Sequence, residues 1–79
     1  MRSVSINANR LRQELARRGL SSRELARHAK LSVLTIRAAL AGRRIAPASL
    51  KQIAESLERI PVLAVADDLL LDVEADGAA

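Results

Sequence analysis

The amino-acid sequence predicts an all-α protein, a compact bundle of four to five helices with a short β-ribbon where its ends meet. No residue is aromatic, so the core must consist of Leu, Ile, Val and Ala, which suits helices better than a β-sandwich or barrel. Apolar residues recur at helical spacing, and most of these runs follow a good N-cap residue. Glycine or proline stands just past three of the runs, where helices commonly end.

Local start signals place the individual helices. The expected helices cover residues 8–18, 22–29, 33–41, 48–57 and 63–70. Asn7, Ser21 and Ser32 are good N-cap residues for the first three. Ser21 and Glu24 also fit the capping box, in which each side chain satisfies a free amide of the other residue. Pro47 stands where a helix can begin, because its missing amide hydrogen is not needed there.

Each predicted helix has one apolar face, and these faces make up the expected core. The core is expected to contain Ile6, Leu11, Leu15, Leu20, Leu25, Ala26, Ala29, Leu31, Ile36, Ala39, Leu40, Leu50, Ile53, Ala54 and Leu57. Ala26 is expected where the second helix crosses the third, because a large side chain there would push the two helices apart.

Charge divides the chain into two parts, which we take as a domain over residues 1–59 and a C-terminal segment over residues 60–79. The first part holds all thirteen basic residues and four of the nine acidic ones, a balance of +9. The second part holds five acidic residues and no basic one. Such a basic body indicates a polyanion as partner, although arginines that are merely solvated would produce the same balance.

The composition also argues against several classes of protein. Without cysteine, and with His28 as the only histidine, the chain offers no disulfide, no metal site and no nucleophile–base set, so we expect neither a cofactor nor enzymatic activity. Stacking of bases on aromatic side chains is excluded, which argues against a single-strand binder. No signal peptide and no membrane-spanning run is recognisable, so we expect a cytoplasmic protein.

The segment from Ser21 to Gly42, SSRELARHAKLSVLTIRAALAG, carries a family resemblance. It resembles the helix-turn-helix of the lambdoid phage repressor and Cro proteins, also called the XRE family. The similarity extends over about residues 9–57 and includes Pro47-Ala-Ser-Leu and Ile53-Ala-Glu-Ser-Leu. Two positions depart from the family pattern: Lys30 replaces a frequent glycine in the turn, and Ser22 replaces a glutamine that helps to hold a phosphate.

The resemblance implies that the third helix enters the major groove of DNA. The base-contacting positions would be Val33, Leu34, Thr35, Arg37 and Ala38. Val33 and Leu34 suit thymine methyl groups and Arg37 suits guanine. The alternative is that the two apolar residues belong to the core, but Ile36, Ala39 and Leu40 already form an inner face at helical spacing, so Val33 is expected to be exposed. The phosphate-contacting positions would be Ser22, Arg23, Ser32, Arg43 and Arg44. The last two belong to a basic loop expected over residues 43–46, which as an alternative would simply be solvated.

These features predict a sequence-specific regulator of transcription that binds double-stranded DNA, most simply a repressor acting as a homodimer on a palindromic operator. The expected dimer interface consists of Val62, Leu63, Leu69, Leu70, Leu71 and Val73. These are more apolar side chains than a short helix can bury, and such an excess indicates an interface. Val4 and Ile6 would join Leu71 and Val73 in the β-ribbon. Two alternatives remain: the same apolar residues could cover the monomer's own core, or bind a protein partner as in an antitoxin.

Overall fold

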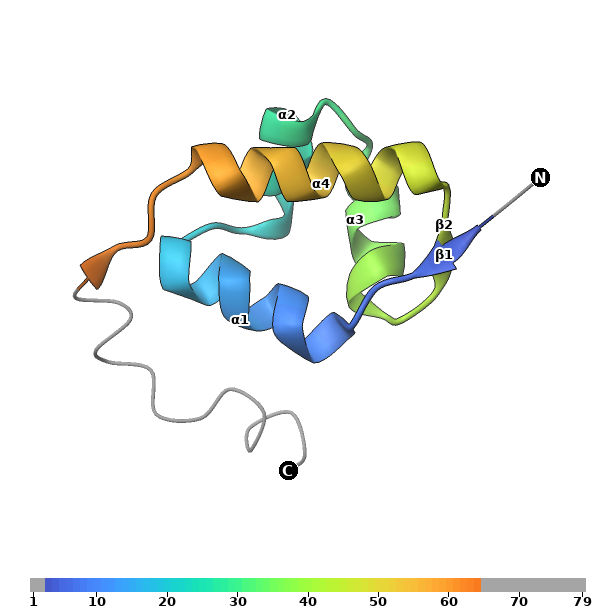
Figure 1. The fold of residues 1–79 in the computed structure, drawn as a ribbon, viewed down its shortest axis with the longest axis horizontal. Helices are drawn as coiled ribbons and strands as arrows, with labels where there is room; N and C mark the ends of the chain where they lie inside the picture. The colour runs from blue at the N-terminus through green and yellow to red at the C-terminus, as the bar shows by residue number, and fades with distance from the viewer. Residues whose placement is uncertain (1–2, 65–79) are drawn as a thin grey trace.

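The structure, a computed structural model, describes residues 3–64 of the chain. This part is mostly helical and carries one small sheet (Figure 1). Its elements are β1 (Val4–Ser5), α1 (Ala8–Arg18), α2 (Ser22–Ala29), α3 (Val33–Leu40), β2 (Arg44–Ile45) and α4 (Pro47–Arg59). The four helices expected within these residues are therefore confirmed. No helix in the described range combines the length and the apolar run that a membrane span requires.

The first two helices have the predicted bounds because their ends are determined by neighbouring side chains. Asn7 Oδ1 accepts a hydrogen bond of 3.1 Å from the amide of Arg10 at the start of α1. Gly19 ends that helix in the left-handed conformation, at φ 65°. At the start of α2 the capping box is complete, because the Glu24 amide donates to Ser21 Oγ and the Ser21 amide donates to the Glu24 carboxylate.

The later elements differ from the prediction at their ends. α3 stops at Leu40, one residue early, and α4 begins at Pro47 and continues to Arg59, two residues further than expected. Arg44 and Ile45 form a strand, so the prediction of a loop over residues 43–46 was wrong. The predicted fifth helix lies beyond the described residues except for Leu63 and Ala64.

The partner of the N-terminal strand also differs from the prediction. β1 pairs with β2 in antiparallel register, Val4 opposite Ile45 and Ser5 opposite Arg44. The expected pairing with Leu71 and Val73 is therefore corrected for Val4, and those two residues lie outside the described range. The physical reason is burial, since Ile45 is 6% exposed and β1 extends the cover over the same core.

The core matches the predicted apolar faces except at Ile45, which was expected in a loop and is buried, and at Ala54. Its buried hydrophobic members are Leu11, Leu15, Leu25, Ala26, Ala29, Ile36, Ala39, Ile45 and Ile53. Leu40, Leu50 and Leu57 are half-buried at its edge. Ala54 is exposed, so its predicted burial was wrong, and the fully buried residues of this part of α4 are Ile53 and Ser56.

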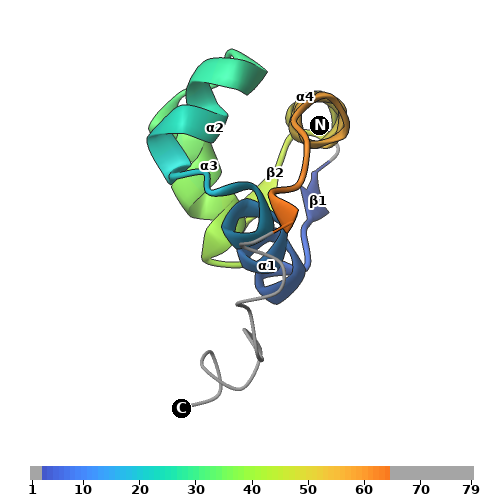
Figure 2. The ribbon, with the colours of Figure 1, turned by 90° about the vertical axis from the view of Figure 1, so that its left-hand side faces the viewer.

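The helices enclose the core from three sides. Viewed along the long axis, α2 and α3 form one side of the molecule, α4 forms the other, and α1 lies across the bottom (Figure 2). The small sheet lies at the opposite end of the molecule from the C-terminal end of α4 (Figure 1). This arrangement leaves α3 with one face on the core and the other on the outside.

Candidate nucleic-acid interface

A tight turn joins α2 to α3 and determines how α3 projects. Lys30 adopts the left-handed conformation, at φ 58° and ψ 41°. The amide of Leu31 donates to the carbonyl of Ala26 at 2.9 Å, which closes the end of α2. Ala26 is 6% exposed, in agreement with the small side chain expected where the two helices cross. The turn thus has the predicted position, and lysine occupies the conformation that glycine adopts most easily.

The first turn of α3 is capped by its own residues. Ser32 Oγ accepts a 3.2 Å hydrogen bond from the amide of Thr35 and lies 3.0 Å from the Thr35 hydroxyl. Ser32 is exposed and Thr35 half-buried. The Ser32 hydroxyl therefore starts the helix abruptly at the surface, as predicted for a helix whose first turn points outward.

The outer face of α3 combines one large apolar side chain with one arginine. Leu34 is 72% exposed and Arg37 is exposed three residues later. Val33 and Ala38 are half-buried and pack against the core. Of the five positions expected to contact bases, Leu34 and Arg37 therefore project fully, whereas Val33, which was expected to be exposed, is half-buried because it packs against the core.

A shallow hollow of about 350 Å³ lies beside this face. Its lining consists of Leu34, Thr35, Ala38, Arg44, Ile45, Ala46 and Ser49. The hollow joins the outer face of α3 to β2 and to the first turn of α4, which has no side-chain cap at Ala46. Sequence reasoning missed this contribution of α4, because β2 was not expected between the two helices.

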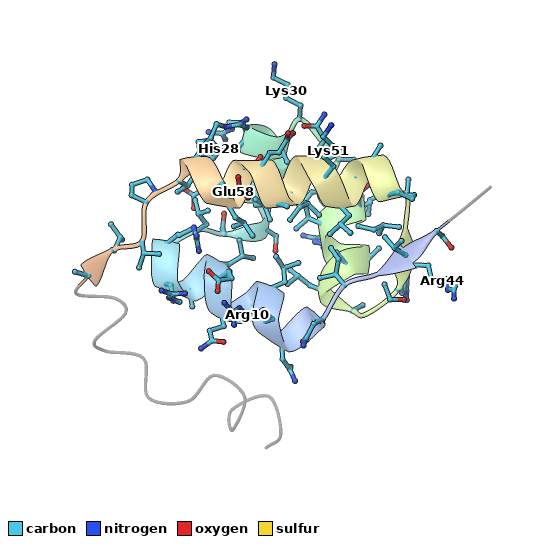
Figure 3. All side chains as sticks on the ribbon, viewed as in Figure 1. Arg10, His28, Lys30, Arg44, Lys51 and Glu58 are labelled. Carbon is cyan, nitrogen blue, oxygen red and sulfur yellow. The ribbon has the colours of Figure 1, made fainter. Side chains whose placement is uncertain are left out.

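Basic side chains lie in the first turn of α2 and in the segment that follows α3. Arg23 and Arg43 are exposed, and within the described residues their side chains make no hydrogen bond or ion pair. Arg44 donates to Ser3 Oγ at 3.2 Å, which ties β2 to the residue before β1. Ser22, the remaining position expected at a phosphate, is half-buried. Figure 3 shows Lys30 and Arg44 at separate edges of the molecule.

The arginines of α1 are instead held by the protein itself. Arg10, Arg17 and Arg18 all form ion pairs with Glu14. Arg18 also donates to the carbonyls of Leu57 and Ile60 at the end of α4. Burial raises the pKa of Glu14, but the hydrogen bond from Arg18 and the charges of the three arginines outweigh it, so the pKa lies below its ordinary value.

Arg12 has a similar role toward α3, because it donates to the carbonyl of Leu40 at 3.0 Å. Sequence reasoning included the α1 arginines in the general positive field. The spacing of Arg10, Glu14 and Arg18 at intervals of four residues was the available signal for an ion-paired face. The bonds to α3 and α4 had no such signal, because their partners lie 28 to 42 residues away.

Comparison with known proteins gave no match: no family model, no curated protein and no solved structure matches this chain.

Proposed function

We propose that this protein is a sequence-specific regulator of transcription that binds double-stranded DNA through α3, with the helix-turn-helix arrangement of the phage repressor and Cro proteins and without enzymatic activity. The observation that carries the proposal is the outer face of α3. Leu34 and Arg37 project from a short, capped helix, while Arg23 on α2 and Arg43 after α3 make no side-chain bond within residues 3–64.

The chemistry of this face suits the floor of the major groove. A helix about 10–12 Å wide fits a groove of about 12 Å. Arg37 can donate two hydrogen bonds to guanine O6 and N7, and Leu34 can contact the C5-methyl group of thymine. The hollow beside Leu34 adds methyl groups from Thr35 and Ala38, so the face is mainly apolar and favours A·T pairs next to a guanine.

The arginines around α3 suit the phosphates on either side of the groove. Arg43 and Arg44 directly follow α3, and Arg23 stands in the first turn of α2. The amides in that first turn carry a partial positive charge, which adds to the attraction. These contacts orient the protein on DNA and are the same for every sequence.

One copy of α3 reads only a few base pairs, too few to select a single site in a genome. We therefore propose a homodimer on a palindromic operator, with half-sites about one helical turn apart, near 34 Å. Repression would follow from occupying a promoter in the cytoplasm.

Selection from a random duplex library tests the proposal directly. The expected result is a palindromic consensus, and an affinity for it that falls at least about tenfold between 50 and 200 mM salt. Arg43→Ala should reduce the salt slope, whereas Lys51→Ala, an exposed change on α4, serves as the matched control. An affinity that stays flat with salt, together with no enriched sequence, would contradict the proposal and favour a protein partner.

A further inference from the structure

An open apolar seam runs between α1 and α4. It has a volume of about 310 Å³, and its apolar wall consists of Ile6, Leu11, Leu50, Ile53, Ala54 and Leu57. Leu11 and Ile53 are core residues, only 3% and 2% exposed, so the seam reaches down to the core.

The α1 side of the seam belongs to a positively charged group. Arg10 and Glu14 line the seam, and Glu14 also pairs with Arg17 and Arg18, which lie outside the lining, so these four side chains together carry a net charge of +2. The Arg10 side chain is 66% exposed although it is bonded to Glu14. An occupant of the seam should therefore be apolar on one side and acidic on the other.

Residues 65–79 of the chain have this composition. They contain five acidic residues and no basic one. If residues 65–73 form a helix, the period of 3.6 places Val65, Ala66, Leu69, Leu70 and Val73 on one face, and three aspartates outside it. An amphipathic helix in an apolar groove is a common mode of recognition, with contacts at this spacing.

The chain approaches the seam at a defined place. The amide of Leu63 donates to the carbonyl of Arg17 at 2.9 Å, and the Leu63 side chain lies over Gly19. Just before Leu63 in the chain, the carbonyls of Leu57 and Ile60 accept hydrogen bonds from Arg18. The last described residues thus cross from the end of α4 to the end of α1, the two helices that border the seam (Figure 1).

We propose that the seam binds the C-terminal segment, residues 65–73, of a second copy of this chain. Reciprocal exchange fills both seams and produces a closed two-fold dimer. This step rests on the proposed function, because reading a palindrome requires two copies of α3. α4, on one side of the seam, lies across the molecule from α2 and α3, so the exchange leaves the outer face of α3 accessible (Figure 2).

The absence of cysteine from the sequence makes a disulfide test possible without DNA. A tagged Ala54→Cys chain, with its new thiol in the seam, is mixed with an untagged Leu70→Cys chain and oxidised. The expected result is a covalent heterodimer, at least about five times more abundant than with Ala48→Cys, a control exposed on α4 but outside the seam. Equal yields for the two positions would overturn the proposal.

A chain carrying both Ala54→Cys and Leu70→Cys separates exchange from docking within one copy. Covalent dimers support exchange, and a covalent monomer overturns it in favour of the chain's own segment. As a second measurement, Ala54→Asp should weaken the dimer at least tenfold in sedimentation equilibrium, while unfolding of the monomer stays unchanged because Ala54 is exposed. Since neither experiment contains DNA, a missing operator would refute the proposed function and leave these results unaffected.

Discussion

The arginines of α1 and those around α3 differ in what holds them. On α1, Arg10, Arg17 and Arg18 share Glu14, and Arg18 also bonds two carbonyls of the α4 end. Around α3, the side chains of Arg37 and Arg43 make no bond within residues 3–64. Each arginine of either set adds one positive charge, but only the arginines of α1 are bound to other groups of the folded chain.

This difference indicates which arginines stabilise the fold and which are available for binding. A guanidinium that satisfies a helix end and a carboxylate stabilises the folded chain, and its removal leaves polar groups without partners. A solvated guanidinium contributes little to stability and is free to meet a phosphate or a base. The two sets should therefore respond in opposite ways when one arginine is removed.

The largest effect is expected from Arg18→Ala. Arg18 is 12% exposed and donates to Glu14, Leu57 and Ile60, so its loss should lower the free energy of unfolding by about 2–3 kcal/mol. Urea denaturation measures the change, with the exposed Arg23→Ala as control, where we expect less than about 0.5 kcal/mol. Equal effects of the two substitutions would remove the distinction between the sets.

Arg37→Ala should show the reverse behaviour. The free energy of unfolding should stay within about 0.5 kcal/mol, because the exposed side chain makes no bond in the described part. Binding to the selected operator should weaken by about 1–3 kcal/mol, with loss of preference at one base pair. Titration of operator variants measures this. A uniform loss across all sequences would reassign Arg37 to phosphate contact.

Acid should destabilise the α1 region through Glu14. Because the folded pKa of Glu14 is lowered, its contribution is present above its ordinary value of 4.5 and is lost as pH falls through the folded pKa. Urea midpoints measured from pH 6 downward should therefore fall more steeply in the natural protein than in Glu14→Gln. Parallel curves would show that the ion pairs of α1 contribute no net stability.

The smallest effect is expected in the turn between α2 and α3. Lys30 has a positive φ of 58°, which is costly for lysine and easy for glycine. Lys30→Gly should raise the free energy of unfolding by about 0.5–1 kcal/mol. This value is the backbone strain that glycine relieves, minus the conformational entropy that glycine adds to the unfolded chain. Thermal unfolding measures this change. Lys51→Gly serves as the control, and because Lys51 lies in the middle of a helix, this substitution should lower the free energy of unfolding by about 1 kcal/mol. A lower free energy of unfolding for both variants would contradict the inference that the backbone at Lys30 is strained.

Features decided by residues close in sequence could be predicted. The bounds of α1 and α2 follow from Asn7, Gly19 and the Ser21–Glu24 capping box, whose partners are three or four residues apart. The inner face of α3, with Ile36 and Ala39, follows from helical spacing in the same way. The position of the turn at Lys30 was also correct, since the cap at Ser32 leaves only one place for it.

Features decided by contacts between distant residues were not predictable. Val4 pairs with Ile45 across 41 residues, so the strand at residues 44–45 had no local signal, and this pairing changed the surface beside α3. Whether Ala54 faces the core or the seam depends on how closely α1 approaches α4. The same holds for Arg12 and Arg18, whose carbonyl partners are brought within reach only when the helices pack.

The amino-acid sequence by itself thus determined which segments of residues 3–64 are helical, where the first two helices begin and end, and that the positive charge lies on residues 1–59. Capping and amphipathic spacing act over three or four residues and need no knowledge of the rest. Tertiary structure alone decided which arginines are bound by the protein and which remain on the surface. Arginine can satisfy a helix end, a carboxylate or solvent equally well, and only the packed arrangement determines which of these lies within its reach.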